Sequence, residues 1–130
     1  MIDPGTEERL VAEAIRSRGH SVSDRSGFAV GAAVEADDGR IFGGCNVENA
    51  TYGLTVCAER VAIWKALSEG VRKFRAVAVV TGAEKPTPPC GACRQILWEF
   101  AGDVPVVSVT ETGGRRLYTM SELLPEPFDL

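Results

Sequence analysis

The sequence has less positive than negative charge, and it contains a single histidine. Its 14 lysine and arginine residues against 18 aspartate and glutamate residues leave a formal net charge of −4 and a pI of about 5.0. A protein that binds a polynucleotide must displace the counterions of many phosphates, which requires a basic surface. The charge balance therefore argues against nucleic acid as a partner.

Long apolar runs are also missing. No stretch approaches the roughly 20 consecutive apolar residues that a membrane-spanning helix needs, so we expect no membrane partner. The first residues, MIDPGTEERL, are acidic and contain neither the basic segment nor the apolar segment of an export signal. We therefore expect a cytoplasmic protein.

Internal repeats, low-complexity tracts and linker-like segments are absent as well. The chain has 130 residues, of which 45% are hydrophobic and 25% are charged. This composition is typical of folded globular proteins and excludes collagen-like, coiled-coil and disordered classes. We expect a single domain, residues 1–130, built around one hydrophobic core.

Segments with helical periodicity alternate with short β-branched segments. The nearly continuous apolar run at residues 75–81 is typical of a central strand that is covered on both faces. The Gly113-Gly114 connection is too short for a parallel crossover, so the last two strands should be antiparallel. The pattern predicts an α/β fold of three layers (α/β/α), with helices on a five-stranded mixed sheet. Helices are expected at about residues 6–17 (capped by Asp3 or Thr6), 55–69, 91–100 and 121–124, and strands at about 28–35, 40–46, 75–81, 104–110 and 115–118.

The four cysteines are more informative by position than by number. Without an export signal they should stay reduced. Cys57 opens one expected helix, Cys90 and Cys93 open another, and Cys45 stands apart. A helix N-terminus favours the thiolate, which is the form that binds metal. Three thiolates suit a zinc site that keeps one position open for water, whereas a fourth ligand would make a structural site.

Glu59 lies two residues after Cys57 in the same expected helix start. Side chains at this spacing point to different sides along a helix, so the two can converge only on a metal beyond the helix end. That geometry favours a proton-transferring base over a ligand. The alternative is a first-turn carboxylate that merely complements the helix dipole.

Residues 57–60 (CAER) and 89–95 (PCGACRQ) together resemble the zinc-dependent cytidine deaminases in their short, three-cysteine form. The resemblance extends from about residue 28 to residue 128 and includes residues 44–50 (GCNVENA) and 122–125 (ELLP). It implies one Zn²⁺ per chain on Cys57, Cys90 and Cys93, with Glu59 as the catalytic proton carrier. The implied reaction is hydrolysis of cytidine and 2′-deoxycytidine to the uridines with release of ammonia, a step of pyrimidine salvage.

The same resemblance assigns the substrate contacts. It implies that Asn46 and Glu48 hold the ribose hydroxyls, that Phe28 lies against the pyrimidine, and that the Ala58 backbone helps hold the base. An amide and a carboxylate two residues apart on an extended segment do point to one side, where both can reach a sugar. Taken alone, Asn46 and Glu48 could equally be a polar strand end, and Phe28 could be a core residue.

Three thiolates on Zn²⁺ leave a net negative charge, which weakens the metal as a Lewis acid. The resemblance places donors to the sulfur atoms at Arg60 and Gln95, which would offset that charge. Without the resemblance, Arg60 would be read as a solvated helix charge.

The resemblance also implies a homotetramer whose subunits share their sites. Tyr52 should lie near an interface, and Phe128 of one subunit should reach the pyrimidine pocket of another. The alternative for Phe128 is a frayed chain end.

Residues 21–27 (SVSDRSG) depart from the family, in which a Tyr-Ser run often precedes the phenylalanine. This leaves room for a modified cytosine nucleoside such as blasticidin S as the substrate. A four-cysteine structural zinc module that includes Cys45 is the alternative from another class. A nucleic-acid editor is disfavoured by the acidic balance and by the Gly113-Gly114 hairpin. We expect His20 to be a surface residue.

Overall fold

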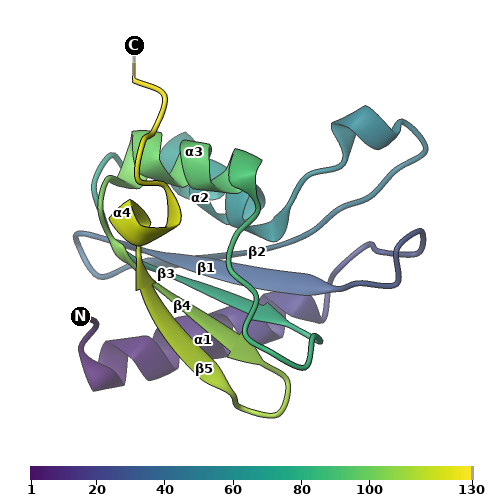
Figure 1. Cartoon of the computed structure of the whole chain (residues 1–130), viewed down its shortest axis with the longest axis horizontal. Helices are drawn as coiled ribbons and strands as arrows, with labels where there is room; N and C mark the ends of the chain where they lie inside the picture. The colour runs from purple at the N-terminus through teal and green to yellow at the C-terminus, as the bar shows by residue number, and fades with distance from the viewer. Residues whose placement is uncertain (130) are drawn as a thin grey trace.

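The computed structural model describes residues 1–129 and is built around a five-stranded sheet with the order β2-β1-β3-β4-β5 (Figure 1). Only β3 and β4 are parallel, and every other neighbouring pair is antiparallel. The predicted mixed sheet, its central strand and its antiparallel last pair are therefore confirmed. The elements are α1 (Pro4–Arg18), β1 (Val30–Ala36), β2 (Ile41–Cys45), the 3₁₀ helix η1 (Tyr52–Leu54), α2 (Ala58–Ser68), β3 (Phe74–Thr81), α3 (Gly91–Ala101), β4 (Pro105–Thr110), β5 (Arg115–Thr119) and α4 (Met120–Leu123).

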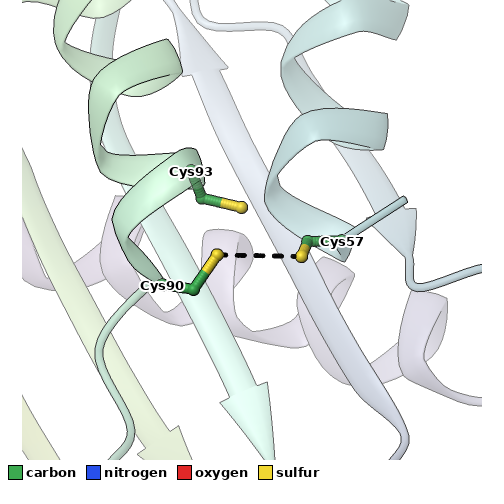
Figure 2. A group of neighbouring side chains, drawn as sticks. All are labelled: Cys57, Cys90 and Cys93. Carbon is green, nitrogen blue, oxygen red and sulfur yellow. Dashed lines mark hydrogen bonds between the residues drawn. The ribbon is translucent and has the colours of Figure 1, made fainter. Parts of the chain in front are cut away.

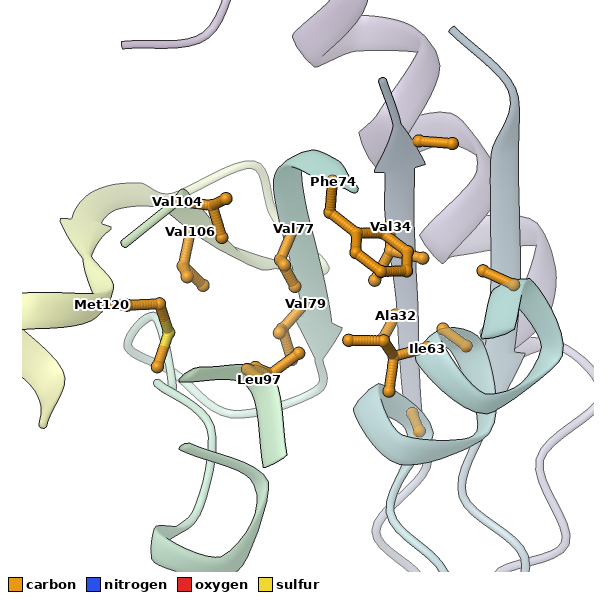
Figure 3. Close-up of a cluster of buried hydrophobic side chains, with 14 of the residues drawn as sticks. Ala32, Val34, Ile63, Phe74, Val77, Val79, Leu97, Val104, Val106 and Met120 are labelled. Atoms are coloured by element: carbon orange, nitrogen blue, oxygen red, sulfur yellow. The ribbon is translucent and has the colours of Figure 1, made fainter. Parts of the chain in front are cut away.

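The sheet separates two apolar layers. On one face, α1 packs its buried Leu10, Val11 and Ala14 against alternate residues of β3 and β4. On the other face, α2, α3 and α4 cover Val77, Val79 and Val106 (Figure 3). Because successive strand residues point to opposite faces, a nearly unbroken apolar strand such as β3 serves both layers. The predicted α/β/α layering is confirmed.

Helix α2 lies unusually close to β2. A Cβ atom on Gly44 would be 2.5 Å from the Ala62 nitrogen and 2.8 Å from the Ala58 carbonyl oxygen. Both distances are far below ordinary contact, so only glycine permits this approach. The N-terminus of α2, which carries Cys57 and Glu59, is therefore set directly against the sheet edge.

Two elements begin later than predicted. Helix α2 begins at Ala58, because Val56 exchanges two backbone hydrogen bonds with Val47 (2.9 and 3.0 Å) and keeps the preceding residues extended. Strand β1 begins at Val30 and leaves Phe28 outside the ladder. Helix α1 does use one of its two expected caps, since the Asp3 carboxylate accepts from the Thr6 N–H at 3.1 Å.

Within residues 1–129, the structure has no helix that combines the length and the apolar character needed to cross a membrane.

Candidate active site

The N-termini of α2 and α3 meet beside the sheet, and each is preceded by a cysteine. Cys57 is the N-cap residue of α2 and Cys90 is that of α3, and neither side chain caps its own helix. Cys93 follows in the first turn of α3 and is buried. Figure 2 shows the three side chains pointing toward one another from the two helices.

The sulfur atoms have the spacing of metal ligands. The Cys57 and Cys90 sulfurs are 3.9 Å apart, and all three sulfurs lie within 4.8 Å of one another. Ligands placed about 2.3 Å from a tetrahedral zinc would be about 3.8 Å apart, so the cluster fits this ion with little movement. Cys45 does not belong to the cluster of metal-capable side chains found among residues 1–129. The three cysteines form a three-ligand site. This geometry argues against the alternative of a structural zinc site with Cys45 as the fourth ligand.

Local contacts favour a thiolate at Cys57. Hydrogen bonding to Cys93, assisted by Arg60 and Cys90, lowers the pKa of the Cys57 thiol to about 5, although burial opposes this shift. The same contact with Cys57, together with burial, raises the pKa of Cys93. The two thiols therefore do not both ionise readily without metal, and a bound cation would favour the thiolate form of each.

Arg60 lies where the sequence placed it. Its Nη2 donates to the Cys57 sulfur at 3.4 Å, and its guanidinium lies 5.9 Å from the centre of the Trp64 ring. A guanidinium group 3.4 Å from the Cys57 sulfur stabilises negative charge on that sulfur.

Glu59 is buried beside the cluster, with only 4% of its surface exposed. Burial raises the pKa of Glu59 to about 7, and the nearby Cys57 thiolate acts in the same direction. A carboxyl group with this pKa can both accept and return a proton at neutral pH, which a solvated glutamate does poorly.

A cavity of about 330 Å³ opens in front of the cluster. It brings together chain segments that are far apart in the sequence. The site residues predicted from sequence that line it are Phe28, Asn46, Glu48, Cys57, Ala58, Glu59 and Cys90.

Asn46 and Glu48 are held firmly on one side of this cavity. The Asn46 side chain accepts from the Val30 N–H (2.9 Å) and donates to the Phe28 carbonyl (2.8 Å). The Glu48 carboxylate accepts from residues 25 and 26, and the Ser26 hydroxyl contact lowers the pKa of Glu48. Both groups are therefore ordered before any ligand arrives.

Phe28 and Ala58 lie at different depths of the cavity. Phe28 is 41% exposed, which is incompatible with a core role and leaves its ring free to contact a ligand. Ala58 is fully buried, and its N–H belongs to the first turn of α2, where backbone donors lack an intrahelical acceptor.

Gln95 does not make the contact predicted for it. Its Nε2 donates to the Phe128 carbonyl oxygen (2.8 Å), and its Oε1 accepts from the Phe128 N–H (2.9 Å). The amide oxygen and one of the two amide N–H groups are thus engaged by the C-terminal tail (residues 125–129), and among the described residues no hydrogen bond joins Gln95 to a cysteine sulfur. The sequence pattern could not reveal this pairing, because it joins segments 33 residues apart.

The two residues predicted to complete a neighbouring site are both exposed. Tyr52 in η1 is 72% exposed and Phe128 is 71% exposed. The guanidinium carbon of Arg25 lies 5.3 Å from the centre of the Tyr52 ring. Tyr52 is not among the residues that line the cavity of its own chain. The prediction that both contact other subunits stays a prediction. His20 is exposed in the turn after α1, as expected.

Sequence reasoning missed several residues around the cavity. Ser21 donates to the Asn46 side chain at 2.5 Å, and Ser26 donates to Glu48 at 2.5 Å. Thr81, Thr87 and Pro88 form part of the wall. Only Pro88, next to the PCxxC motif, carried a local signal, because the serine contacts span 25 and 22 residues.

Fold and site together define an α/β protein with a candidate metal centre, in which three cysteines at two helix N-termini lie beside a buried carboxylate. The family model described as "Cytidine and deoxycytidylate deaminase zinc-binding region" matches residues 4–110. The chain belongs to this family, which makes it a hydrolytic deaminase.

Individual relatives agree with this assignment. A cytidine deaminase from Sporosarcina psychrophila is 48% identical over 122 residues, covering 93% of this chain and 90% of that protein. A crystal structure of cytidine deaminase from Burkholderia pseudomallei superposes with a TM-score of 0.90 at 43% identity, covering 93% and 98% of the two chains. A blasticidin-S deaminase from Bacillus cereus is 31% identical over an alignment of 104 residues, which covers 74% of this chain and 74% of that protein.

Proposed function

We propose that this protein is a zinc-dependent cytidine deaminase that converts cytidine and 2′-deoxycytidine to the uridines and releases ammonia. One observation carries the proposal: the thiolate cluster and the buried Glu59 share one cavity with Asn46 and Glu48. The groups that can activate water and the groups that can bind a sugar hydroxyl are thus close enough to contact the same nucleoside.

Cys57, Cys90 and Cys93 would hold the zinc, and Arg60 would offset part of their negative charge. Zinc bound there would supply a Lewis acid that makes water nucleophilic at neutral pH. Glu59 would take one proton of the attacking water and deliver it to N3 of the pyrimidine. It would then take the remaining proton from the C4 hydroxyl and give it to the amine, which leaves as ammonia while the C4 carbonyl forms. Its pKa of about 7 suits these opposite transfers.

Protein groups already occupy most of the hydrogen-bond donors and acceptors of Asn46 and Glu48. The Asn46 side-chain oxygen already accepts from Val30 and Ser21, and one of its two N–H groups donates to Phe28, which leaves one N–H free. Three of about four acceptor positions on the Glu48 carboxylate are filled from residues 25 and 26. One donor and one acceptor remain, which match a single sugar hydroxyl. This supports both the ribonucleoside and the 2′-deoxyribonucleoside as substrates.

The base would lie deeper in the cavity. The exposed ring of Phe28 offers it an apolar face, and the first-turn N–H of Ala58 offers a donor.

We further propose a cytoplasmic homotetramer that acts in pyrimidine salvage. The four free thiols suit a reducing compartment. Tyr52 and Phe128 are large, exposed aromatic residues, and such residues are enriched at interfaces.

Measurement of ammonia release and ultraviolet change tests the proposal. Cytidine and 2′-deoxycytidine should both be turned over, and free cytosine far more slowly, because it has no hydroxyl for Glu48. Blasticidin S is included because of the 31% identical relative that acts on it. Preferred turnover of blasticidin S would replace the proposed substrate.

Glu59→Gln is the catalytic control. It should retain zinc and the fold and lose activity by at least the roughly 10²- to 10⁴-fold that general acid-base catalysis supplies. Near-normal activity of this variant would overturn the mechanism.

A further inference from the structure

We propose that Ser26 is a positioning residue for substrate binding, whose hydroxyl holds Glu48 in the orientation that captures the sugar. This inference rests on the proposed function, and it assigns a role to the segment at residues 21–27.

Glu48 is half-buried on the loop after β2, where a glutamate side chain without hydrogen-bond partners would sample several rotamers. Its Oε1 accepts from the Arg25 N–H (3.1 Å) and the Ser26 N–H (3.0 Å), and its Oε2 accepts from the Ser26 hydroxyl (2.5 Å). The two N–H contacts act on one oxygen only. The Ser26 hydroxyl is therefore the described contact that fixes the second oxygen, and with it the rotation of the carboxylate.

The hydroxyl itself is oriented by a neighbour. Ser26 Oγ accepts from the Phe28 N–H at 3.0 Å, so its single proton is directed away from that donor and toward Glu48. Gly27 makes this turn possible, with a φ of +69° that side chains rarely adopt.

Backbone hydrogen bonds also connect the loop that carries Glu48 to residues 21–27. The Val22 N–H donates to the Asn46 carbonyl (3.1 Å), and the Glu48 N–H donates to the Val22 carbonyl (2.8 Å). Removal of the Ser26 hydroxyl should therefore leave the loop in place. It would release Oε2 of Glu48 from its described contact and leave the Phe28 N–H without that acceptor. That separation makes the inference testable by kinetics.

The test compares Ser26→Ala with the wild-type zinc-loaded enzyme. We expect KM for cytidine to rise roughly 3- to 20-fold with kcat nearly unchanged, as for a lost hydrogen bond to a charged group that aids ground and transition states equally. KM for 2′,3′-dideoxycytidine should not change, because that nucleoside lacks the hydroxyl that Glu48 would hold. Ser26→Thr, which keeps a hydroxyl, should restore most of the loss.

A double-mutant cycle separates action through Glu48 from direct contact with substrate. In a Glu48→Gln background, Ser26→Ala should add no further rise in KM for cytidine. Ser23→Ala is the matched control, because it makes the same chemical change in the same segment, where the Ser23 carbonyl accepts a backbone bond from Gly27. It should behave like wild type.

Three results would overturn the inference: an unchanged KM for Ser26→Ala, an equal rise with the dideoxynucleoside, or full additivity with Glu48→Gln. Each would appear in an enzyme that still deaminates cytidine. If the wild-type protein does not act on cytidine, the proposed function fails instead.

Discussion

Glu59 and Glu48 belong to the same site, and their different surroundings shift their pKa values in opposite directions. Burial raises the pKa of Glu59 to about 7, whereas the hydroxyl and N–H donors of residues 25 and 26 lower that of Glu48. Glu59 can therefore exchange protons near neutral pH, while Glu48 stays charged and accepts hydrogen bonds. The sequence contains both as equivalent carboxylates eleven residues apart.

The four cysteines also differ in their surroundings, because three of them form the sulfur cluster and Cys45 lies outside it. Measurement of zinc content in cysteine variants tests this difference. Cys90→Ser should lose zinc, because a serine hydroxyl is a poor substitute for a thiolate ligand. Cys45→Ser should keep one zinc per chain, since Cys45 lies outside the sulfur cluster. Equal zinc loss in both variants would argue for a closed four-cysteine site. The measurement is zinc content after dialysis, with circular dichroism as the check on folding.

At the scale of elements, the site depends on how closely α2 approaches the sheet. The helix carries Glu59 in its first turn and follows directly on Cys57, so its height above β2 sets the position of both. Gly44 permits the short separation, and the backbone pairing of Val56 with Val47 fixes where the helix begins. Helical propensity alone does not define either feature.

Gly44→Ala tests this close packing. The added methyl group would overlap the α2 backbone at Ala62 and Ala58, which should lower the free energy of unfolding by about 1 to 3 kcal/mol. Urea denaturation would measure the change. Gly53→Ala is the control, because a Cβ atom there meets nothing within 4 Å. A shift of similar size in both variants would contradict the packing argument.

At the scale of the whole molecule, the C-terminal tail is anchored while its aromatic ring stays exposed. The Gln95 amide forms two hydrogen bonds with the Phe128 backbone, yet 71% of Phe128 is exposed. A chain end held by two bonds is not simply frayed, and an exposed ring at a fixed place is suited to contact another subunit. Gln95 thus connects the helix of Cys90 and Cys93 to the tail.

Light scattering and truncation test the assembly. The protein should have about four times the 13.9 kDa chain mass. Removal of residues 128–130 should raise KM for cytidine by roughly 2- to 10-fold, the range of one aromatic contact. Gln95→Ala should shift KM in the same direction, because it releases the tail. Asp129→Asn, which leaves the ring and its anchor intact, should not. A fully active monomer would exclude the shared site.

The sequence by itself determined the layer order of the domain and the zinc cluster. Periodicity reports which residues face a core, and the motifs at residues 57–60 and 89–95 place cysteines at two helix starts, so both are local signals. Tertiary structure alone decided that α2 starts at Ala58, that Gln95 binds the tail, and that Ser26 orders Glu48. These features are contacts between segments 22 or more residues apart, or depend on strand pairing, and no local pattern encodes them.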